Sequence, residues 1–233
     1  MIVFVHGSQS DRRVWGPLLE LAPTGTQVST FDLPDHGGSA DEPTPDPEPL
    51  RRALVDHVNA LPAQTVTLVG HSLGAHLIAS TAERLEGRVE RAVLLSGFDV
   101  LHEVDEALYR AMADGLEGGR LDLELLREMA LDAAVGEAEL SPELRGLVTQ
   151  MQVMSFERAV RSLRRGLLLG PPSVCRYGFE ATVLHGRDDA AIRFELGEEL
   201  ARAGTRARLV PLDTESHLLP LTHAAELAPH VYG

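Results

Sequence analysis

Short apolar runs alternate with amphipathic helical patterns along most of this chain, and this alternation limits the possible fold more than any other feature. Most of the runs are continuous and rich in residues that favour strands, which is typical of parallel strands covered by helices on both faces. The predicted strands are 2–5, 27–31, 65–69, 91–95, 182–185 and 207–211. The predicted helices between and after them are 15–22, 49–60, 72–85, 194–203 and 222–230. The sequence therefore predicts an α/β fold with a mostly parallel sheet flanked by helices.

One long segment, residues 98–178, interrupts the alternation, because it carries helical patterns without a strand-like run. Helices are predicted there at 104–116, 121–135, 142–153 and 156–168. Ser141-Pro142 marks a helix start, since serine is a favoured N-cap and proline is favoured at the first helical position. We therefore expect a small helical cap of residues 98–178, inserted into a core made of residues 1–97 and 179–233.

The composition is that of a folded globular protein, with 233 residues of which 44% are hydrophobic and 24% charged. Asp plus Glu number 35 against 21 Lys plus Arg, so the net charge of −14 disfavours nucleic acid and anionic membranes as partners. The N-terminus lacks the pattern of a signal peptide, and no run approaches the length of a membrane span, so we expect a cytoplasmic protein. The single cysteine, Cys175, cannot form an intramolecular disulfide.

The strongest chemical signal is the sequence Gly70-His71-Ser72-Leu73-Gly74, which directly follows the predicted strand 65–69 and directly precedes a helical pattern. A serine at such a tight strand-to-helix turn takes a strained backbone conformation that exposes its hydroxyl, and the following helix points its N–H groups at the developing oxyanion. A neutral serine hydroxyl is a poor nucleophile, so it needs an imidazole to accept its proton and a carboxylate to orient that imidazole.

Further motifs follow other predicted strands in the chain. They are His6-Gly7 after the first strand, Asp32-Leu33-Pro34-Asp35-His36-Gly37-Gly38-Ser39 after the second, His185-Gly186-Arg187-Asp188-Asp189 after the fifth, and Ser216-His217 after the last. With the Ser72 turn they make the chain resemble the α/β-hydrolase superfamily over nearly its whole length. The resemblance implies a three-layer α/β-hydrolase fold whose catalytic groups lie at the carboxyl ends of the strands.

The resemblance also assigns roles to residues of this chain. Ser72 is the expected nucleophile, His217 the base and Asp189 the acid, in the chain order known for this fold. The backbone N–H groups of Ser8 and Leu73 are the expected oxyanion hole. We interpret the His6 side chain and the loop from Asp32 to Ser39 as scaffold.

The chain departs from the family pattern at several points. Asp35 stands where the family has glycine in its D-x-P-G-H-G-x-S loop, and Ser216 stands where glycine usually precedes the histidine. Asp99 follows another strand at a position that some relatives use for the acid. The first strands of the family are missing, which indicates a trimmed member or a chain whose true start lies upstream.

The predicted cap supplies candidate substrate-binding residues. Met151, Met154 and Phe156, with Met112 and Met129, could line a pocket for an acyl group or alcohol, although such residues often pack helices together. Arg158, Arg161, Arg164 and Arg165 form a basic face on one helix, which is either paired with acids or a clamp for an anionic substrate. The histidines show no spacing typical of metal ligands, and Cys175 lacks the partner pattern of a nucleophile.

The residues favour a hydrolase that cleaves a small carboxylic ester, or a related lactone or thioester, through an acyl-enzyme and without a cofactor. One alternative is a lyase or synthase, because the D-L-P-x-H-G-x-S loop followed by alanine also resembles menaquinone-pathway members of the superfamily. Another is a ligand receptor that keeps the pocket but turns over slowly. Fold alone does not decide among these functions.

Overall fold

Six strands form a single parallel sheet in the computed structural model, which describes residues 1–136, 140–152, 154–169 and 176–233. The strands are β1 (Ile2–Val5), β2 (Val28–Thr30), β3 (Val66–His71), β4 (Val89–Leu95), β5 (Glu180–Gly186) and β6 (Ala207–Leu212). Their order across the sheet is β2-β1-β3-β4-β5-β6, and every neighbouring pair is parallel. The α/β fold class and all six predicted strands are confirmed.

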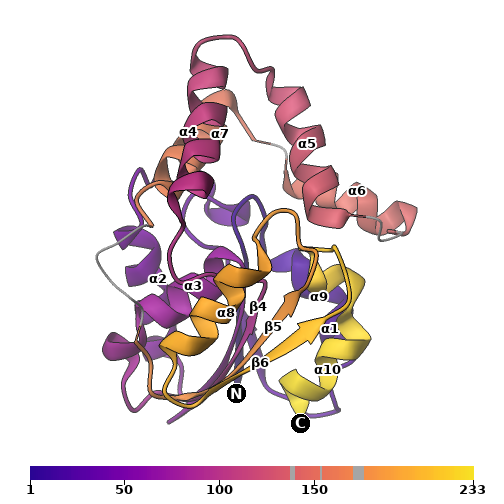
Figure 1. Cartoon of the computed structure of the whole chain (residues 1–233). Coiled ribbons are helices and arrows are strands. Elements are labelled where there is room, and N and C mark those ends of the chain that lie inside the picture. Colours follow the sequence, from indigo (N-terminus) through magenta and orange to yellow (C-terminus); the bar gives the residue numbers. More distant parts are fainter. Residues whose placement is uncertain (137–139, 153, 170–175) are drawn as a thin grey trace.

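Helices cover both faces of this sheet and make a three-layer core (Figure 1). One face packs against α2 (Glu48–Ala60), α3 (Leu73–Ser80) and α8 (Phe194–Ala203). The other packs against α1 (Gly16–Glu20), α9 (Leu219–Thr222) and α10 (Ala224–Tyr232). Successive side chains of a strand point to opposite faces of the sheet, so one strand contributes to both layers. Val3 and Val5 of β1 join the first cluster of apolar side chains, and Phe4 joins the second.

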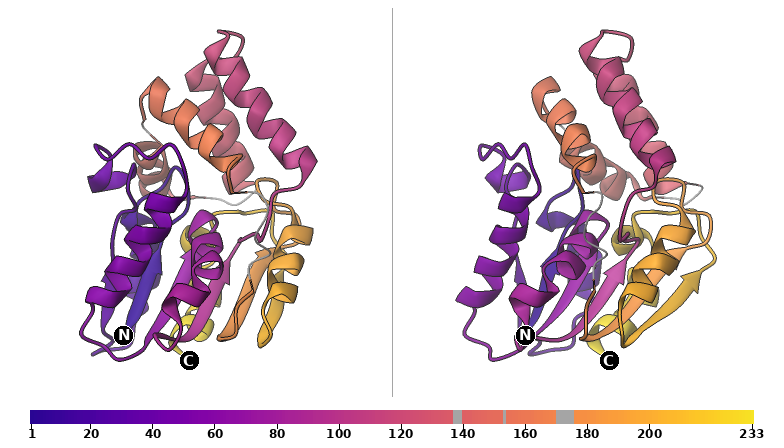
Figure 2. Two further views of the ribbon diagram at one scale, coloured as in Figure 1. Left: turned by 90° about the vertical axis from the view of Figure 1, so that its left-hand side faces the viewer. Right: turned by 60° about the vertical axis from the view of Figure 1, so that its left-hand side comes forward.

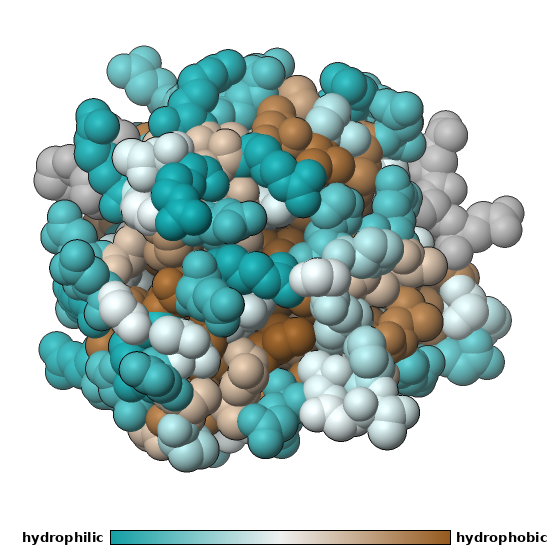
Figure 3. All heavy atoms as spheres, turned by 90° about the horizontal axis from the view of Figure 1, so that it is seen from below, coloured by the Kyte–Doolittle hydropathy of each residue, from teal (hydrophilic) through white to brown (hydrophobic). Residues whose placement is uncertain are grey.

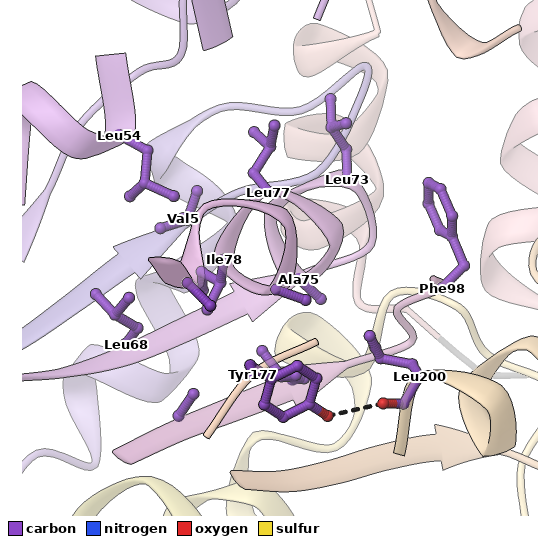
Figure 4. Packing of buried hydrophobic residues seen from close by; sticks show 14 of the residues in the cluster. Val5, Leu54, Leu68, Leu73, Ala75, Leu77, Ile78, Phe98, Tyr177 and Leu200 are labelled. Atoms are coloured by element: carbon purple, nitrogen blue, oxygen red, sulfur yellow. Dashed lines mark hydrogen bonds between the residues drawn. The ribbon is translucent and has the colours of Figure 1, made fainter. Parts of the chain in front are cut away.

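The layer around α3 shows how the nucleophile turn is supported from behind. Leu73, Leu77 and Ile78 of α3 pack among strand and helix side chains in Figure 4. In the same cluster the Tyr177 hydroxyl donates a hydrogen bond to the Leu200 carbonyl of α8 at 2.8 Å. Burying this many apolar side chains fixes α3 on β3, and therefore fixes the turn between them.

Four helices inserted between β4 and β5 stand over the carboxyl ends of the strands (Figure 2). They are α4 (Glu103–Glu117), α5 (Leu123–Val135), α6 (Pro142–Met151) and α7 (Phe156–Gly166), close to the predicted ranges. Ser141 caps α6 as predicted, because its hydroxyl accepts from the Leu144 N–H. Helices α4, α5 and α7 share a small apolar cluster with Leu126, Met154 and Leu163 among its members.

The two ends of the predicted cap segment lie against the core. Phe98 and Leu101 at its start, and Leu169 and Tyr177 at its end, pack in the cluster that contains α2, α3 and α8. The four helices therefore rise from segments that are packed on the sheet. The division into a core of 1–97 and 179–233 and a cap of 98–178 stays a prediction.

Three predicted helices differ from the structure at their boundaries. The helix predicted at 72–85 ends at Ser80 and continues as a 3₁₀ turn, Ala82–Leu85, because Thr81 donates its hydroxyl to the Leu77 carbonyl and leaves helical geometry. A 3₁₀ turn, Arg12–Trp15, replaces the start of the helix predicted at 15–22. The last predicted helix, 222–230, is α10, which begins at Ala224, and the short helix α9 before it was not predicted. A short 3₁₀ turn, Gly37–Ser39, was not predicted.

The opposite end of the molecule, where the strands begin, holds a cavity of about 410 Å³. Its lining includes the polar residues Glu83, Glu90, Arg176 and Arg206, and none of the helices α4 to α7 contributes to it. Seen from this end, hydrophilic side chains surround scattered hydrophobic ones (Figure 3). No helix within the described residues is long and apolar enough to span a bilayer.

Candidate active site

Ser72 lies in a strained turn between β3 and α3, with φ of 52° and ψ of −117°. A positive φ is costly for a residue with a side chain and persists only where the surroundings enforce it. Two residues before and two residues after Ser72, only glycine fits, because a Cβ at Gly70 or Gly74 would come within 3 Å of backbone atoms. The Gly74 contact is with the Val5 carbonyl, so the turn and β1 are in direct contact.

His217 and Asp189 meet on neighbouring loops after β6 and β5. The His217 Nδ1 atom lies 2.8 Å from Asp189 Oδ2, and both residues are buried. The other carboxylate oxygen, Oδ1, accepts from the N–H groups of Ala191 and Ile192 at 2.9 Å each. An ionised carboxylate only accepts hydrogen bonds, so Nδ1 of His217 carries the proton of the neutral imidazole. The other ring nitrogen, Nε2, can therefore accept a second proton.

Two opposing effects act on the Asp189 carboxyl. Burial alone would raise its pKa, but the nearby imidazole of His217, its hydrogen bond and the Ile192 N–H hold the pKa below its ordinary value. Asp189 is therefore ionised at neutral pH and can stabilise a protonated His217. The adjacent Asp188 is exposed, and its backbone N–H donates to the Thr214 carbonyl.

The nucleophile and the base are close but not hydrogen-bonded. Among the described residues the Ser72 hydroxyl has no hydrogen bond to the His217 ring, and each residue is 8% exposed. In enzymes without substrate such a bond is often long and tightens only when substrate binds. The neighbouring side chain, His71, has its ring centroid 4.9 Å from that of His217.

The backbone of His217 is held on both sides. Its carbonyl accepts a hydrogen bond from Nε2 of His71 at 2.8 Å. Its N–H donates to the carbonyl of Ala134, on the cap helix α5, at 2.9 Å, and the Leu218 N–H donates to the same oxygen at 3.0 Å. Burial lowers the pKa of the His71 imidazole to about 3, so His71 is neutral and can donate through Nε2 alone.

The loop after β1 approaches the Ser72 turn closely. A Cβ at Gly7 would lie 3.1 Å from the Ser72 Cβ and 2.9 Å from His71 Nδ1, so only glycine fits there. Ser8 is the next residue on this loop, and Leu73 opens α3, whose first N–H groups have no partner inside the helix. The two segments that carry the predicted oxyanion-hole donors therefore meet at the Ser72 turn, and the role of these donors stays a prediction.

His6 and Asp32 hold these loops in place. His6 is fully buried, donates through Nδ1 to the Gly7 carbonyl at 2.8 Å and accepts the Leu33 N–H at Nε2 at 3.0 Å. Asp32 accepts the N–H groups of Arg12 and Gly38 at 2.8 Å each. The contacts of His6 with Leu33 and of Asp32 with Arg12 join the loop after β1 to the loop after β2, as expected of scaffold residues.

The sequence also matches a known protein family over nearly its whole length. The model of the "Alpha/beta hydrolase family" matches residues 2–230. The chain belongs to the alpha/beta hydrolase family. Among relatives, the (E)-2-((N-methylformamido)methylene)succinate hydrolase of Acinetobacter baylyi is 24% identical over 226 residues, which cover 95% of this chain and 84% of that protein.

Other members of the alpha/beta hydrolase family carry different activities in their names. The 2-succinyl-6-hydroxy-2,4-cyclohexadiene-1-carboxylate synthase of Klebsiella pneumoniae is 26% identical over 131 residues, covering 56% of this chain and 52% of that protein. The crystal structure of the enol-lactonase from Burkholderia xenovorans has a TM-score of 0.82 and 21% identity, and the match covers 99% of this chain and 88% of that one. At that identity the likeness supports the shared fold alone.

The three predicted substrate-binding residues of this alpha/beta hydrolase lie apart. Met151 is buried, with its sulfur 3.7 Å from the hydroxyl of Ser10 on the loop after β1. Met154 packs inside the cap's own cluster, and Phe156 is 42% exposed at the start of α7. The structure therefore brings Met151 to the loop that follows Ser8, and does not bring the other two there.

The basic face of α7 is largely paired with acids. Arg161 and Arg165 both donate to the buried carboxylate of Asp35, and Arg164 pairs with Asp114 and Glu117 on α4. Burial would raise the pKa of the Asp35 carboxyl, but the hydrogen bonds from Arg161 and Arg165 hold it below its ordinary value. Asp35 has a φ of 68°, the conformation for which the family's glycine is suited.

Two contacts at the site were not predicted from the sequence. The Ala134 carbonyl is a backbone group and leaves no signal in the residue type. The bond from His71 to the His217 carbonyl joins residues that are 146 positions apart.

Cys175 lies outside the described residues, and no cluster of three His, Cys, Asp or Glu side chains that could hold a metal occurs in the part of the chain that the structure describes.

Proposed function

We propose that this chain is a serine hydrolase that cleaves a carboxylic ester, or a related lactone or thioester, through Ser72. The observation that carries the proposal is the 2.8 Å bond between His217 Nδ1 and the buried Asp189 carboxylate, beside a serine held at a strained strand-to-helix turn. This arrangement leaves Nε2 of His217 free to take the Ser72 proton. Ester cleavage needs nothing beyond these groups, and the relative whose match covers 95% of this chain is named as a hydrolase, which supports hydrolysis as the reaction type.

In the proposed reaction Ser72 Oγ attacks the carbonyl carbon while His217 Nε2 accepts the hydroxyl proton. The oxyanion of the tetrahedral intermediate accepts hydrogen bonds from the N–H groups of Ser8 and Leu73. Collapse breaks the bond to the leaving alcohol, which takes the proton from His217, and leaves an acyl-enzyme. A water molecule, deprotonated by His217, then releases the acid and restores Ser72.

Hydrolysis of 4-nitrophenyl esters of graded acyl length tests this proposal. We expect sustained turnover by the native chain and a loss of at least about 10³-fold in kcat for Ser72→Ala, with unchanged circular dichroism. A fluorophosphonate probe should label Ser72, as mapped by peptide mass spectrometry. A single slow turnover would instead indicate a ligand receptor, and a label on another residue would contradict the assignment of the nucleophile.

A synthase or lyase that uses the same three residues is the second candidate, because a synthase is among the relatives. Such an enzyme uses His217 and Ser72 to move a proton and does not form an acyl-enzyme. The two candidates differ in one observable. Mass spectrometry after rapid acid quench detects an acyl group on Ser72 in a hydrolase that forms an acyl-enzyme, and none in the synthase.

A further inference from the structure

A cavity of about 300 Å³ lies beside the loop after β1, between that loop and the cap. Its lining contains Asp11, Arg12, Arg13, Asp32, Gly37, Gly38, Gln150, Met151 and Arg158. Met151 also contacts Ser10, so the cavity follows the residues that come directly after Ser8. It therefore borders the loop that carries Ser8 and lies away from the end of the sheet where the strands begin.

Most charges around this cavity are paired. Arg13 donates to both carboxylate oxygens of Asp11, and Asp32 accepts the backbone N–H groups of Arg12 and Gly38. Asp35, just behind, is held by Arg161 and Arg165. Each of these carboxylates therefore accepts hydrogen bonds from groups other than Arg158.

Arg158 differs from its neighbours. Its side chain is only 16% exposed, yet its nearest carboxylate oxygen is Asp35 Oδ1 at 3.8 Å, beyond hydrogen-bond distance. Within the described residues its guanidinium has no hydrogen bond. Burial lowers the pKa of the Arg158 guanidinium from its ordinary value. A guanidinium carries five donors in a planar fork, so a half-buried one facing a cavity is suited to a planar anion.

The local charge supports the same reading. Arg12, Arg13, Arg158, Arg161 and Arg165 face three aspartates, Asp11, Asp32 and Asp35, which leaves a surplus of two positive charges in a protein of net charge −14. Arg158 is also one helical turn before Ser162, whose hydroxyl lies 3.0 Å from the Ser8 hydroxyl. Residues four apart share a helix face, so Arg158 and Ser162 present the same side of α7 to this loop.

We propose that Arg158 binds a carboxylate of the substrate, so that the enzyme prefers esters that carry a second, free carboxylate group. This inference rests on the proposed hydrolase function for its reaction, but the binding site can be tested without turnover. The carbonyl of the ester would lie at Ser8 and Leu73, and the free carboxylate would lie in the cavity at Arg158. Bidentate pairing would fix the orientation of the substrate as well as its affinity.

The binding test uses Ser72→Ala, which cannot react, and two ligands of equal carbon skeleton. Monomethyl glutarate carries one carboxylate and one methyl ester, and dimethyl glutarate carries two methyl esters and no charge. Titration calorimetry should show tighter binding of monomethyl glutarate. Adding Arg158→Gln should lower that preference by about 10- to 100-fold, the range for a hydrogen bond to a charged group.

Two further variants control the interpretation. Arg158→Lys should keep part of the preference, because it retains the charge but not the fork. Arg164→Gln removes a charge from the same helix where it pairs with Asp114 and Glu117, and should leave the preference unchanged. Equal binding of the two ligands by Ser72→Ala, or a preference that survives Arg158→Gln, would overturn the proposal.

Kinetics then separate this inference from the proposed function. Hydrolysis of 4-nitrophenyl butyrate without any preference for the mono-4-nitrophenyl ester of succinic acid would support the hydrolase function and contradict the carboxylate site. A preference for monomethyl glutarate in binding, with no hydrolysis of any ester, would support the carboxylate site and contradict the hydrolase function. The two failures are thus distinguishable.

Discussion

The backbone N–H of His217 donates to the carbonyl of Ala134 at 2.9 Å, which joins the proposed catalytic base to the cap helix α5. Ser216 strengthens the junction, since its buried hydroxyl lies 3.4 Å from the same carbonyl and accepts from the Thr222 hydroxyl. Glycine, which usually stands at this place in the family, could not make these bonds. The cap of this chain is therefore in contact with the base itself, and a shift of α5 would move His217.

Gly136→Ala tests this junction. Gly136 ends α5 with a φ of 60°, and a Cβ there would lie 2.7 Å from the Glu215 Cβ, two residues before His217. We expect kcat to fall by about 10- to 100-fold, because small displacements of a catalytic group are costly. Gly146→Ala on α6 is the matched control, since its Cβ would meet nothing within 4 Å. Equal activities of the two variants would argue against the junction.

Asp189→Asn tests the acid. An amide of the same shape can present its N–H to His217 and favour the wrong tautomer, so we expect kcat to fall by about 10⁴-fold with little loss of stability. Asp188→Asn is the control, because Asp188 is exposed and its side chain is not bonded to His217. Steady-state kinetics with a 4-nitrophenyl ester measure both. If Asp99→Asn or Asp188→Asn lost activity while Asp189→Asn kept it, the acid would have to be reassigned.

The sequence predicts the sheet well because most strands are continuous apolar runs, as burial on both faces requires, while the edge strands β2 and β6 are only partly buried. It also predicts that Ser72, Asp189 and His217 follow separate strands, and parallel strands bring such loops to one edge. The three groups are neighbours for this topological reason. The contacts of Met154 and Phe156 were beyond prediction, since apolar residues in a helix can face either the cap's own cluster or the site.

The role of Asp35 was also beyond prediction, for a different reason. Its position suggested only a departure from glycine within a scaffold loop. Its partners, Arg161 and Arg165, lie 126 and 130 residues later, and nothing local in the sequence relates them. The basic face of α7 was recognised, and both of its interpretations, acid pairing and anion binding, remained open until the buried carboxylate was located.

Asp35→Asn is expected to destabilise the protein. Arg165 is 2% exposed, so removing the charge of Asp35 leaves a buried guanidinium without its counter-ion, at about 3–5 kcal/mol in the free energy of unfolding. Because the pKa of Asp35 is depressed in the folded chain, its contribution is present above the ordinary pKa of about 3.9 and is lost as the pH falls through the folded value. The gap in stability between the native chain and the variant should therefore close below about pH 4.

The surface variant Arg164→Gln serves as the comparison for Asp35→Asn. Its partners, Asp114 and Glu117, are about half exposed, and such exposed ion pairs contribute little to stability because solvent screens them. Urea denaturation at several pH values measures both variants. A loss for Asp35→Asn no larger than that for Arg164→Gln would mean that the Asp35 cluster does not hold the cap on the core.

The last prediction concerns His71, which we interpret as a positioning residue for His217. His71→Phe keeps an aromatic ring but removes the donor to the His217 carbonyl, and we expect kcat to fall by about 10- to 100-fold with a smaller change in KM. His71→Gln can still donate from its side chain, so it should recover part of the loss. Equal losses in both variants would indicate that ring packing matters and the hydrogen bond does not.

Stability against pH gives a second readout for His71. The pKa of His71 is about 3 in the folded chain, and that of an unfolded histidine is about 6.5. Between these two pH values the unfolded state therefore binds a proton that the folded state does not. The native chain should therefore lose stability through His71 as the pH falls from about 6.5 to 3, by up to about 1.4 kcal/mol per pH unit. His71→Phe lacks this loss, and the other buried histidines act equally in both proteins. The stability advantage of the native chain over His71→Phe at pH 7 should thus shrink by about 3 kcal/mol on going to pH 4, and parallel curves would show that His71 is not held neutral.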